Sequence, residues 1–285
     1  MLLITCGEKK GGNHPPRIDM VRINPEVIHT LDRVILNPVV SDPDGDEVTI
    51  SYQWRLNGSP ILTAKSSTLS VELRKGDRIE VELTPDDGKT KGKIYRVGPL
   101  IVKNSPPQII EYTLSPINLT SDTTLALSVK TEDIDGDRVE VTVDWELNGN
   151  IVDDLKNHYQ ISPPNFRRGD KIVCILTATD GEDFHRVRST EIEVKNAPPK
   201  FVDFNSAYQN GKITVQVTGS DPDGDPIILE LVSGPATTKI DRKNLRLTWE
   251  VPETLRDAYT DTLLLKLSDP FGGNSEVKLP ITISY

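Results

Sequence analysis

Cysteine and histidine, the residues that form disulfides and most often bind zinc, are scarce in this sequence. Its two cysteines, Cys6 and Cys174, lie in unlike settings, which excludes a disulfide framework. Its four histidines are dispersed, with neither zinc-ligand spacing nor a nucleophile–base pattern. Aromatic residues make up 5% of the chain, so a stacking platform for sugars or bases would need most of the Trp and Tyr that the cores require. Without a catalytic constellation, the sequence predicts that the protein is not an enzyme.

Long hydrophobic runs and an excess of positive charge are also missing. No stretch approaches the length of a transmembrane helix. The formal net charge is −10, from 43 Asp and Glu against 33 Lys and Arg. This charge argues against nucleic acid as a partner and against electrostatic adsorption to anionic lipid. Much of the acidity is concentrated in three short turns, where it suits divalent cations.

The chain contains one module written three times. Each copy opens with an Asn-x-Pro-Pro segment and carries an Asp-x-Asp-Gly-Asp turn about a third of the way in. The opening segments start at Asn13, Asn104 and Asn196, and the acidic turns start at Asp42, Asp133 and Asp221. A period of roughly 90 residues is too long for a solenoid repeat and suits a tandem series of independent small β-domains.

The repeats predict the domain organisation. We expect an N-terminal tail over 1–14, immunoglobulin-like domains over 15–104 (repeat one) and 105–196 (repeat two), and a cadherin-like domain over 197–285 (repeat three). Two successive prolines fix φ and hold the preceding residue extended, so the junctions should be stiff. The predicted fold is therefore all-β, with three tandem immunoglobulin-like β-sandwiches in an elongated array.

Strand patterns support this fold class. Apolar residues occupy every second position over 48–56 and again over 139–147, which predicts half-buried strands with Trp54 and Trp145 on their inner faces. Both runs end in Asn-Gly, the pair that favours a type I′ hairpin. A later strand aligns Cys174 with the core position Val81, so Cys174 is expected to be a small buried hydrophobe. The best candidate for a short helix is 253–258.

Repeats one and two resemble the tandem immunoglobulin-like, polycystic-kidney-disease-type modules of bacterial envelope proteins. The resemblance rests on Ser-Asp-Pro-Asp-Gly-Asp at 41–46, Tyr-Gln-Trp at 52–54, Asn-Gly at 57–58 and the Asn-x-Pro-Pro segment at 104. Repeat three is similar to cadherin-like modules through Ser-Asp-Pro-Asp-Gly-Asp at 220–225 and Leu-Thr-Trp at 247–249. The resemblance implies the sandwich fold; modules of this kind serve as adhesin stalks, enzyme appendages and matrix spacers alike.

The acidic turns are the candidate site. Oxygen-rich clusters suit Ca²⁺, which takes six to eight oxygen ligands. In cadherin-type repeats a carboxylate pair in one loop, an Asp in a later loop and a linker Asn meet at the module boundary, and the resemblance implies the same grouping here. The later Asp is Asp86 or Asp87 in repeat one. The candidate Ca²⁺ ligands are Asp42, Asp44, Asp46, Asp86, Asp133, Asp135, Asp137, Asp180, Asp221, Asp223, Asp225 and Asp269.

A second interpretation of the same turns stays open. Asp-Pro-Asp-Gly is also a good β-turn, with Pro at the second position, Gly supplying a positive φ and Asp capping its own backbone. On that interpretation the turns are solvated and bind no metal. No other cofactor is predicted.

The N-terminus suggests an anchor. The apolar run before Cys6, followed by Gly7 and a polar tail, resembles the end of a bacterial lipoprotein signal, in which the Cys receives lipid. The segment differs from a lipoprotein signal in two ways: Thr5 precedes the Cys, and the apolar run is too short for a full signal. A lipoprotein would therefore require a start site upstream. The alternative is a free Cys in a frayed tail.

These patterns together predict a function. We expect a non-catalytic, surface-anchored array that acts as a spacer or as an adhesion or protein-binding scaffold. Its partner would be a protein or cell-surface component, and its location the bacterial cell envelope or the extracellular space, as an outer-membrane lipoprotein in a Gram-negative host. The alternative is an accessory module or subunit of a secreted enzyme or envelope assembly.

Overall fold

The computed structural model describes residues 12–255 and 258–284, and this part of the chain is built from strands and turns. Its helical segments are two short 3-10 helices, Asp153–Leu155 (η1) and Glu253–Leu255 (η2). The second falls where the sequence predicts a short helix, although 256–257 lie outside the described residues. The protein is therefore all-β, as predicted. Within the described residues no helix is both long and apolar enough to cross a bilayer.

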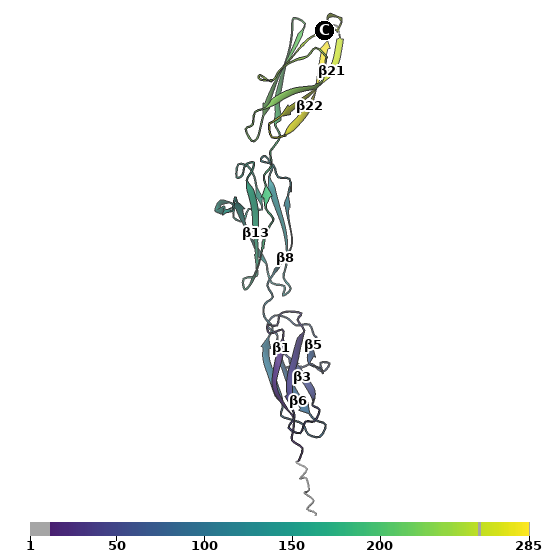
Figure 1. The fold of residues 1–285 in the computed structure, drawn as a ribbon, viewed down its shortest axis with the longest axis vertical. Coiled ribbons are helices and arrows are strands. Elements are labelled where there is room, and N and C mark those ends of the chain that lie inside the picture. The colour runs from purple at the N-terminus through teal and green to yellow at the C-terminus, as the bar shows by residue number, and fades with distance from the viewer. Residues whose placement is uncertain (1–11, 256–257, 285) are drawn as a thin grey trace, which may run out of the picture. The chain divides into compact units, whose positions relative to one another are not determined.

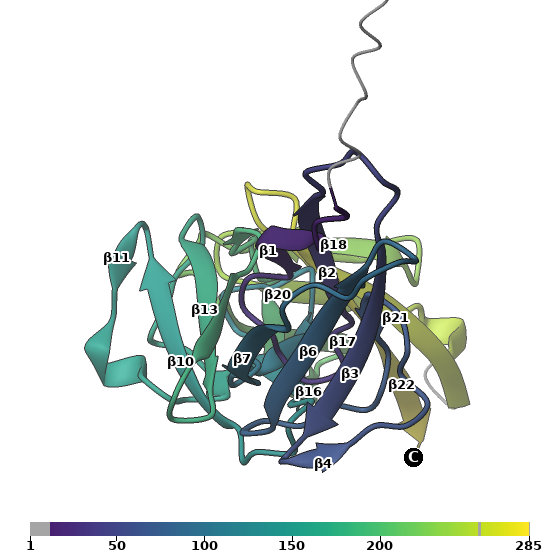
Figure 2. The same cartoon turned by 90° about the horizontal axis from the view of Figure 1, so that it is seen from below.

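Repeat one forms two antiparallel sheets. One has the order β1-β2-β5 and the other β4-β3-β6-β7 (Figures 1 and 2). The strands are β1 (Arg17–Asn24), β2 (Val34–Ser41), β3 (Thr49–Leu56), β4 (Ser59–Pro60), β5 (Thr68–Leu69), β6 (Arg78–Asp86) and β7 (Tyr95–Ile101). Between the sheets lies a core that includes Trp54, Leu69, Ile79, Val81 and Leu83, each at most 1% exposed.

Repeat two also forms two sheets, with the orders β12-β9-β8 and β11-β10-β13-β14, and β15 pairs with β13. The strands are β8 (Gln108–Ser115), β9 (Leu125–Glu132), β10 (Glu140–Leu147), β11 (Asn150–Ile151), β12 (Gln160–Ile161), β13 (Lys171–Thr179), β14 (Phe184–Arg188) and β15 (Ile192–Glu193). Trp145 and Cys174 are buried here. Cys174 is fully buried, as predicted, and burial raises the pKa of its thiol to about 12.

Repeat three follows the same plan, with sheets β16-β17-β20-β19 and β18-β21-β22. The strands are β16 (Lys200–Gln209), β17 (Lys212–Ser220), β18 (Ile228–Ser233), β19 (Lys239–Asp241), β20 (Arg246–Glu250), β21 (Ala258–Ser268) and β22 (Asn274–Ser284). Its core includes Trp249, Leu263, Leu265 and Leu267.

The described part of the chain divides into two compact units. One contains the chain up to Ile110 together with Thr131–Glu140 and Ala178–His185, and the other contains the rest. The two loops that carry the acidic residues of repeat two therefore group with repeat one, whereas repeat three groups with most of repeat two. The three-domain division stays a prediction.

The tight hairpins follow their sequence signals. Asn57-Gly58 joins β3 to β4 with φ values of 51° and 80°, and Asn148-Gly149 joins β10 to β11 with 52° and 81°. Both residues of a type I′ turn need positive φ, which Asn and Gly adopt with little strain. Asn210-Gly211, between β16 and β17, uses the same conformation in repeat three.

Candidate functional site: three acidic turns

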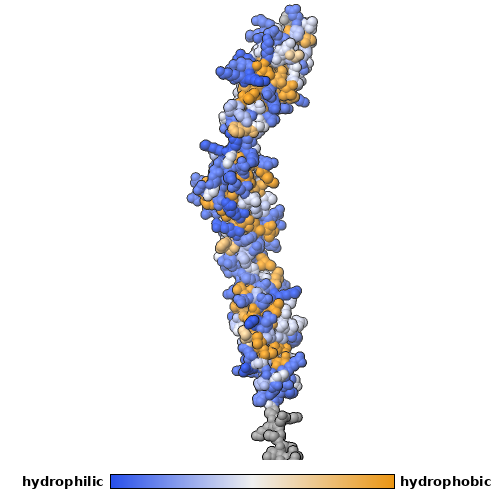
Figure 3. All heavy atoms as spheres, viewed as in Figure 1, coloured by the Kyte–Doolittle hydropathy of each residue, from blue (hydrophilic) through white to orange (hydrophobic). Residues whose placement is uncertain are grey.

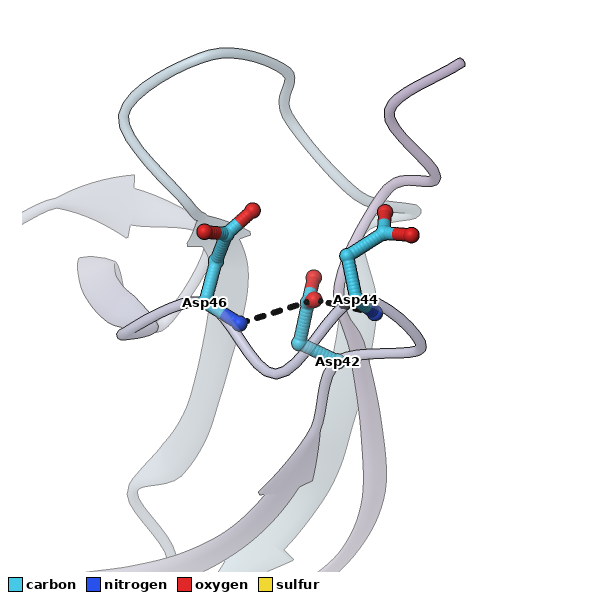
Figure 4. Close-up of side chains that lie close together, drawn as sticks. All are labelled: Asp42, Asp44 and Asp46. Atoms are coloured by element: carbon cyan, nitrogen blue, oxygen red, sulfur yellow. Dashed lines mark hydrogen bonds between the residues drawn. The ribbon is translucent and has the colours of Figure 1, made fainter. Parts of the chain in front are cut away.

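Each Asp-x-Asp-Gly-Asp turn is held by the carboxylate of its first Asp. Asp42 Oδ1 accepts hydrogen bonds from the backbone N–H of Asp44 at 2.8 Å and of Asp46 at 3.1 Å (Figure 4). Asp133 and Asp221 do the same in the other turns, at 2.8 and 3.2 Å. The Gly has a φ of 80° or 81° in all three, a conformation that favours glycine. The repeated residues thus fold into a repeated local structure.

The first Asp of each turn also presents an unsatisfied oxygen. The Oδ2 atoms of Asp42, Asp133 and Asp221 are buried and have no hydrogen-bond partner. In each turn the three Asp residues can place a carboxylate oxygen within 4.8 Å of the others. Because a buried carboxylate oxygen without a partner is costly, the arrangement fits a cation.

The Asn of each Asn-x-Pro-Pro segment contacts a second acidic loop. Its Nδ2 donates to Asp87 in repeat one, to Asp180 in repeat two and to Asp269 in repeat three, each at 2.8 Å. Asn104 also donates to Asp183 at 3.0 Å. The structure therefore brings together the linker Asn and the later-loop Asp that the resemblance implies. In repeat one that Asp is Asp87, whereas Asp86 ends strand β6 and accepts the Gly88 N–H.

The residue after each Asn completes the link to the acidic turn. The backbone N–H groups of His14, Ser105 and Ala197 donate to the middle Asp of the turn, at 2.6, 2.6 and 2.8 Å. We call the Asn, the residue after it and the two acidic loops that they contact the linker clamp. For repeats one and two it lies in the first unit, and for repeat three in the second. The clamp fixes the Pro-Pro segment against the repeat that follows it.

Hydrogen bonds to the clamp carboxylates shift their acidity. The His14 backbone N–H lowers the pKa of Asp44, and the Asn13 side chain lowers the pKa of Asp87. For Asp180 and Asp269 the largest single influence is burial, which raises the pKa, but hydrogen bonds from Asn104 or Asn196 and from backbone N–H groups outweigh it and lower the pKa. All four groups are therefore held as carboxylates.

A basic side chain lies against each acidic turn, a contact that was not predicted from the sequence. Lys89 Nζ is 2.7 Å from Asp46 Oδ2 in repeat one. Lys75 Nζ lies 2.8 Å from Asp137 Oδ2 and 2.6 Å from Glu182 Oε1. Arg168 pairs with Asp225. The available signal was the basic residue before Gly-Asp in two repeats, at 75 and 168, which on sequence alone indicated only a turn.

The three Asp residues of each predicted acidic turn thus lie together. Asp180 and Asp269 are linked to their turns through the linker Asn, and Asp86 does not contact it. Calcium binding by any of these residues stays a prediction. The predicted lipid-attachment residue, Cys6, lies outside the described residues. With paired antiparallel sheets and a Trp in each core, the repeats have an all-β, immunoglobulin-like sandwich fold.

Comparisons with known proteins give no family for the chain. No family model and no curated protein matches the chain. Among solved structures, eight N-terminal Ig domains of Down Syndrome Cell Adhesion Molecule are 14% identical with a TM-score of 0.45; the match covers 95% of this chain and 36% of that one. A titin fragment is 10% identical over 95% and 99%, with a TM-score of 0.35. A Drosophila N-cadherin fragment is 13% identical over 95% and 75%, with a TM-score of 0.28.

Proposed function

We propose that this chain is a non-catalytic array that acts as a spacer or as an adhesion or protein-binding scaffold. The linker clamp is the observation that carries the proposal. A chain that only tethered its modules would gain nothing from fixing each Pro-Pro segment by hydrogen bonds to two loops of the next repeat. A short Pro-Pro junction held in this way suits a protein that presents its modules to a partner rather than leaving them loosely tethered.

The surface supports a protein or cell-surface component as the partner. Hydrophobic side chains on the visible face form small patches between hydrophilic ones (Figure 3). Large exposed apolar residues occur in all three repeats, including Leu62, Ile117, Phe184 and Phe271. A mixed surface of this kind suits polar, non-obligate contacts with other proteins.

Anchoring through a lipid on Cys6 is the second part of the proposal. The lipoprotein-like run before Cys6 supports it, and the proposed location is the bacterial cell envelope, at the outer membrane in a Gram-negative host. Cell fractionation of the tagged protein with and without Cys6→Ser tests this: the parent should be in the membrane fraction and the variant should be released. An unchanged soluble location of both would reject the anchor.

The scaffold itself is tested by cross-linking in the producing cells, followed by purification and mass spectrometry. A reproducible envelope or surface protein supports the scaffold. An enzyme held in fixed stoichiometry would favour the alternative of an accessory subunit. Turnover of generic glycoside, ester or peptide substrates by the purified chain, lost on mutation of a single residue, would overturn the non-catalytic assignment.

A further inference from the structure

The basic residues at the second and third acidic turns come from the preceding repeat. Lys75 and Arg168 each stand directly before a Gly-Asp pair, and the Gly has a φ of 85° or 86°. In both turns the Asp accepts the backbone N–H two residues upstream of the Gly, at 2.8 Å from Arg74 and at 2.7 Å from Arg167. Two equivalent turns therefore project a cation from equivalent positions.

The later acidic loop differs in charge between repeats one and two, in a way that matches where the basic residue comes from. After Asp87-Gly88 in repeat one stands Lys89, but after Asp180-Gly181 in repeat two stands Glu182. Lys89 pairs with Asp46 of its own repeat. Glu182 has the opposite charge, and Lys75 bridges it to Asp137 within the first unit. Where the aligned residue is basic, as Lys89 is, the acidic turn pairs with a cation of its own repeat. Where it is acidic, as Glu182 is, the turn pairs with Lys75 of the preceding repeat.

The third turn accepts a guanidinium group. Both terminal nitrogens of Arg168 donate to the Asp225 carboxylate, and Nη1 also donates to Asn196 Oδ1 at 2.5 Å. Its Cζ lies 3.8 Å from the ring centroid of Phe271. The side chains of Asp223 and Asp225 are only 5% and 10% exposed. The planar fork and the stacked ring suit arginine, whereas Lys75 leaves the equivalent Asn104 Oδ1 without a partner.

We propose that Lys75 and Arg168 are the resident cations of the second and third acidic turns, in the place that a divalent metal ion would take. A Ca²⁺ ion held 2.3–2.6 Å from the same carboxylates would lie within a few ångströms of the ammonium or guanidinium group. At such distances the two cations repel strongly, so each excludes the other. The third Asp of each turn is therefore compensated without a metal, by Lys75 at Asp137, by Arg168 at Asp225 and by Lys89 at Asp46. The Oδ2 atoms of the first Asp residues keep no hydrogen-bond partner.

Calcium titration of the full-length chain by calorimetry tests the proposal. Lys75→Met removes the cation and keeps an apolar stem, so it should bind Ca²⁺ at least about ten-fold more tightly than the parent, with one added site. Arg168→Gln should gain a site at the third turn. Lys171→Met is the matched control, because it removes a lysine that pairs with Glu191 outside the acidic turns.

A compensating variant separates this effect from a general change in charge. Glu182→Lys places a lysine where repeat one has Lys89, so adding it to Lys75→Met should abolish the gained site. Lys89→Glu should create a Ca²⁺ site in repeat one. This variant provides an independent test if Lys75→Met does not fold.

Three outcomes would overturn the proposal. One is a parent chain that binds Ca²⁺ as tightly as Lys75→Met and Arg168→Gln. Another is the absence of any gain in folded Lys75→Met, Arg168→Gln and Lys89→Glu. The third is an equal gain in Lys171→Met.

Discussion

At the scale of single residues, the linker clamp of repeat three depends on a close approach that only glycine permits. A Cβ atom on Gly273 would lie 2.1 Å from Asp269 Oδ2 and 2.6 Å from Asn196 Nδ2. Gly273→Ala should therefore break the Asn196–Asp269 hydrogen bond and lower the free energy of unfolding by about 1–3 kcal/mol. Thermal unfolding monitored by circular dichroism measures this. Gly12→Ala, where a Cβ meets nothing within 4 Å, should leave the melting temperature unchanged.

The clamp carboxylates also give stability a dependence on pH. The folded-state pKa values of Asp44, Asp87, Asp180 and Asp269 lie below the ordinary value of 3.8. A lowered pKa stabilises the folded state fully above the unfolded pKa, and this stability is lost as the pH falls through the folded pKa. Denaturant midpoints should therefore stay level from pH 7 to about 5 and fall below about 4.

The matched variant for the pH experiment is Asn104→Ala. It removes the side-chain donor that helps to lower the Asp180 pKa. Its midpoint at pH 7 should lie below that of the parent, and the gap should narrow in acid. A gap that stays constant from pH 7 to 2 would contradict the assigned role of Asn104.

At the scale of elements, each sandwich is organised around one Trp. Trp145 is 1% exposed and its Nε1 donates to the His158 carbonyl at 2.9 Å, as Trp54 does to Ser66. Trp145→Ala should cost about 3–5 kcal/mol in chemical denaturation because it leaves a large cavity. Trp145→Phe keeps most of the volume and should cost less. Equal losses in the two variants would mean that the hydrogen bond, rather than packing, dominates.

Elements were more predictable from sequence than contacts. The alternation over 48–56 predicted strand β3, and the alignment with Val81 placed Cys174 in the core, because period two and burial are local properties of a strand. The Asn210-Gly211 hairpin was missed although its signal was present. The pairs Lys75–Asp137 and Arg168–Asp225 join residues 62 and 57 positions apart, and nothing local in the sequence links them. The signals that were present were the basic residue before Gly-Asp at 75 and 168 and the aligned change from Lys89 to Glu182.

At the scale of the whole molecule, the three-domain division is open to experiment. Repeat three contains a core of its own, centred on Trp249 and the buried leucines of β21. Residues 197–285 expressed alone should therefore fold and melt cooperatively, as measured by circular dichroism and one-dimensional NMR. A fragment that gains structure only when joined to 105–196 would instead make repeats two and three one folding unit.

The change from a positive charge at Lys89 to a negative charge at Glu182 limits how the repeats could be copied and rearranged within such a protein. Tandem-repeat genes grow and rearrange by copying modules, and a module copied into a new position must suit the neighbour before it. A copy of repeat one brings its own cation, Lys89, and needs none from the repeat before it. A copy of repeat two needs a predecessor that ends in a basic Gly-Asp turn, since Asp137 and Glu182 would otherwise face each other uncompensated. The order in which the repeats can follow one another is therefore restricted, and the residue at the position of Lys89 and Glu182 is one of its determinants.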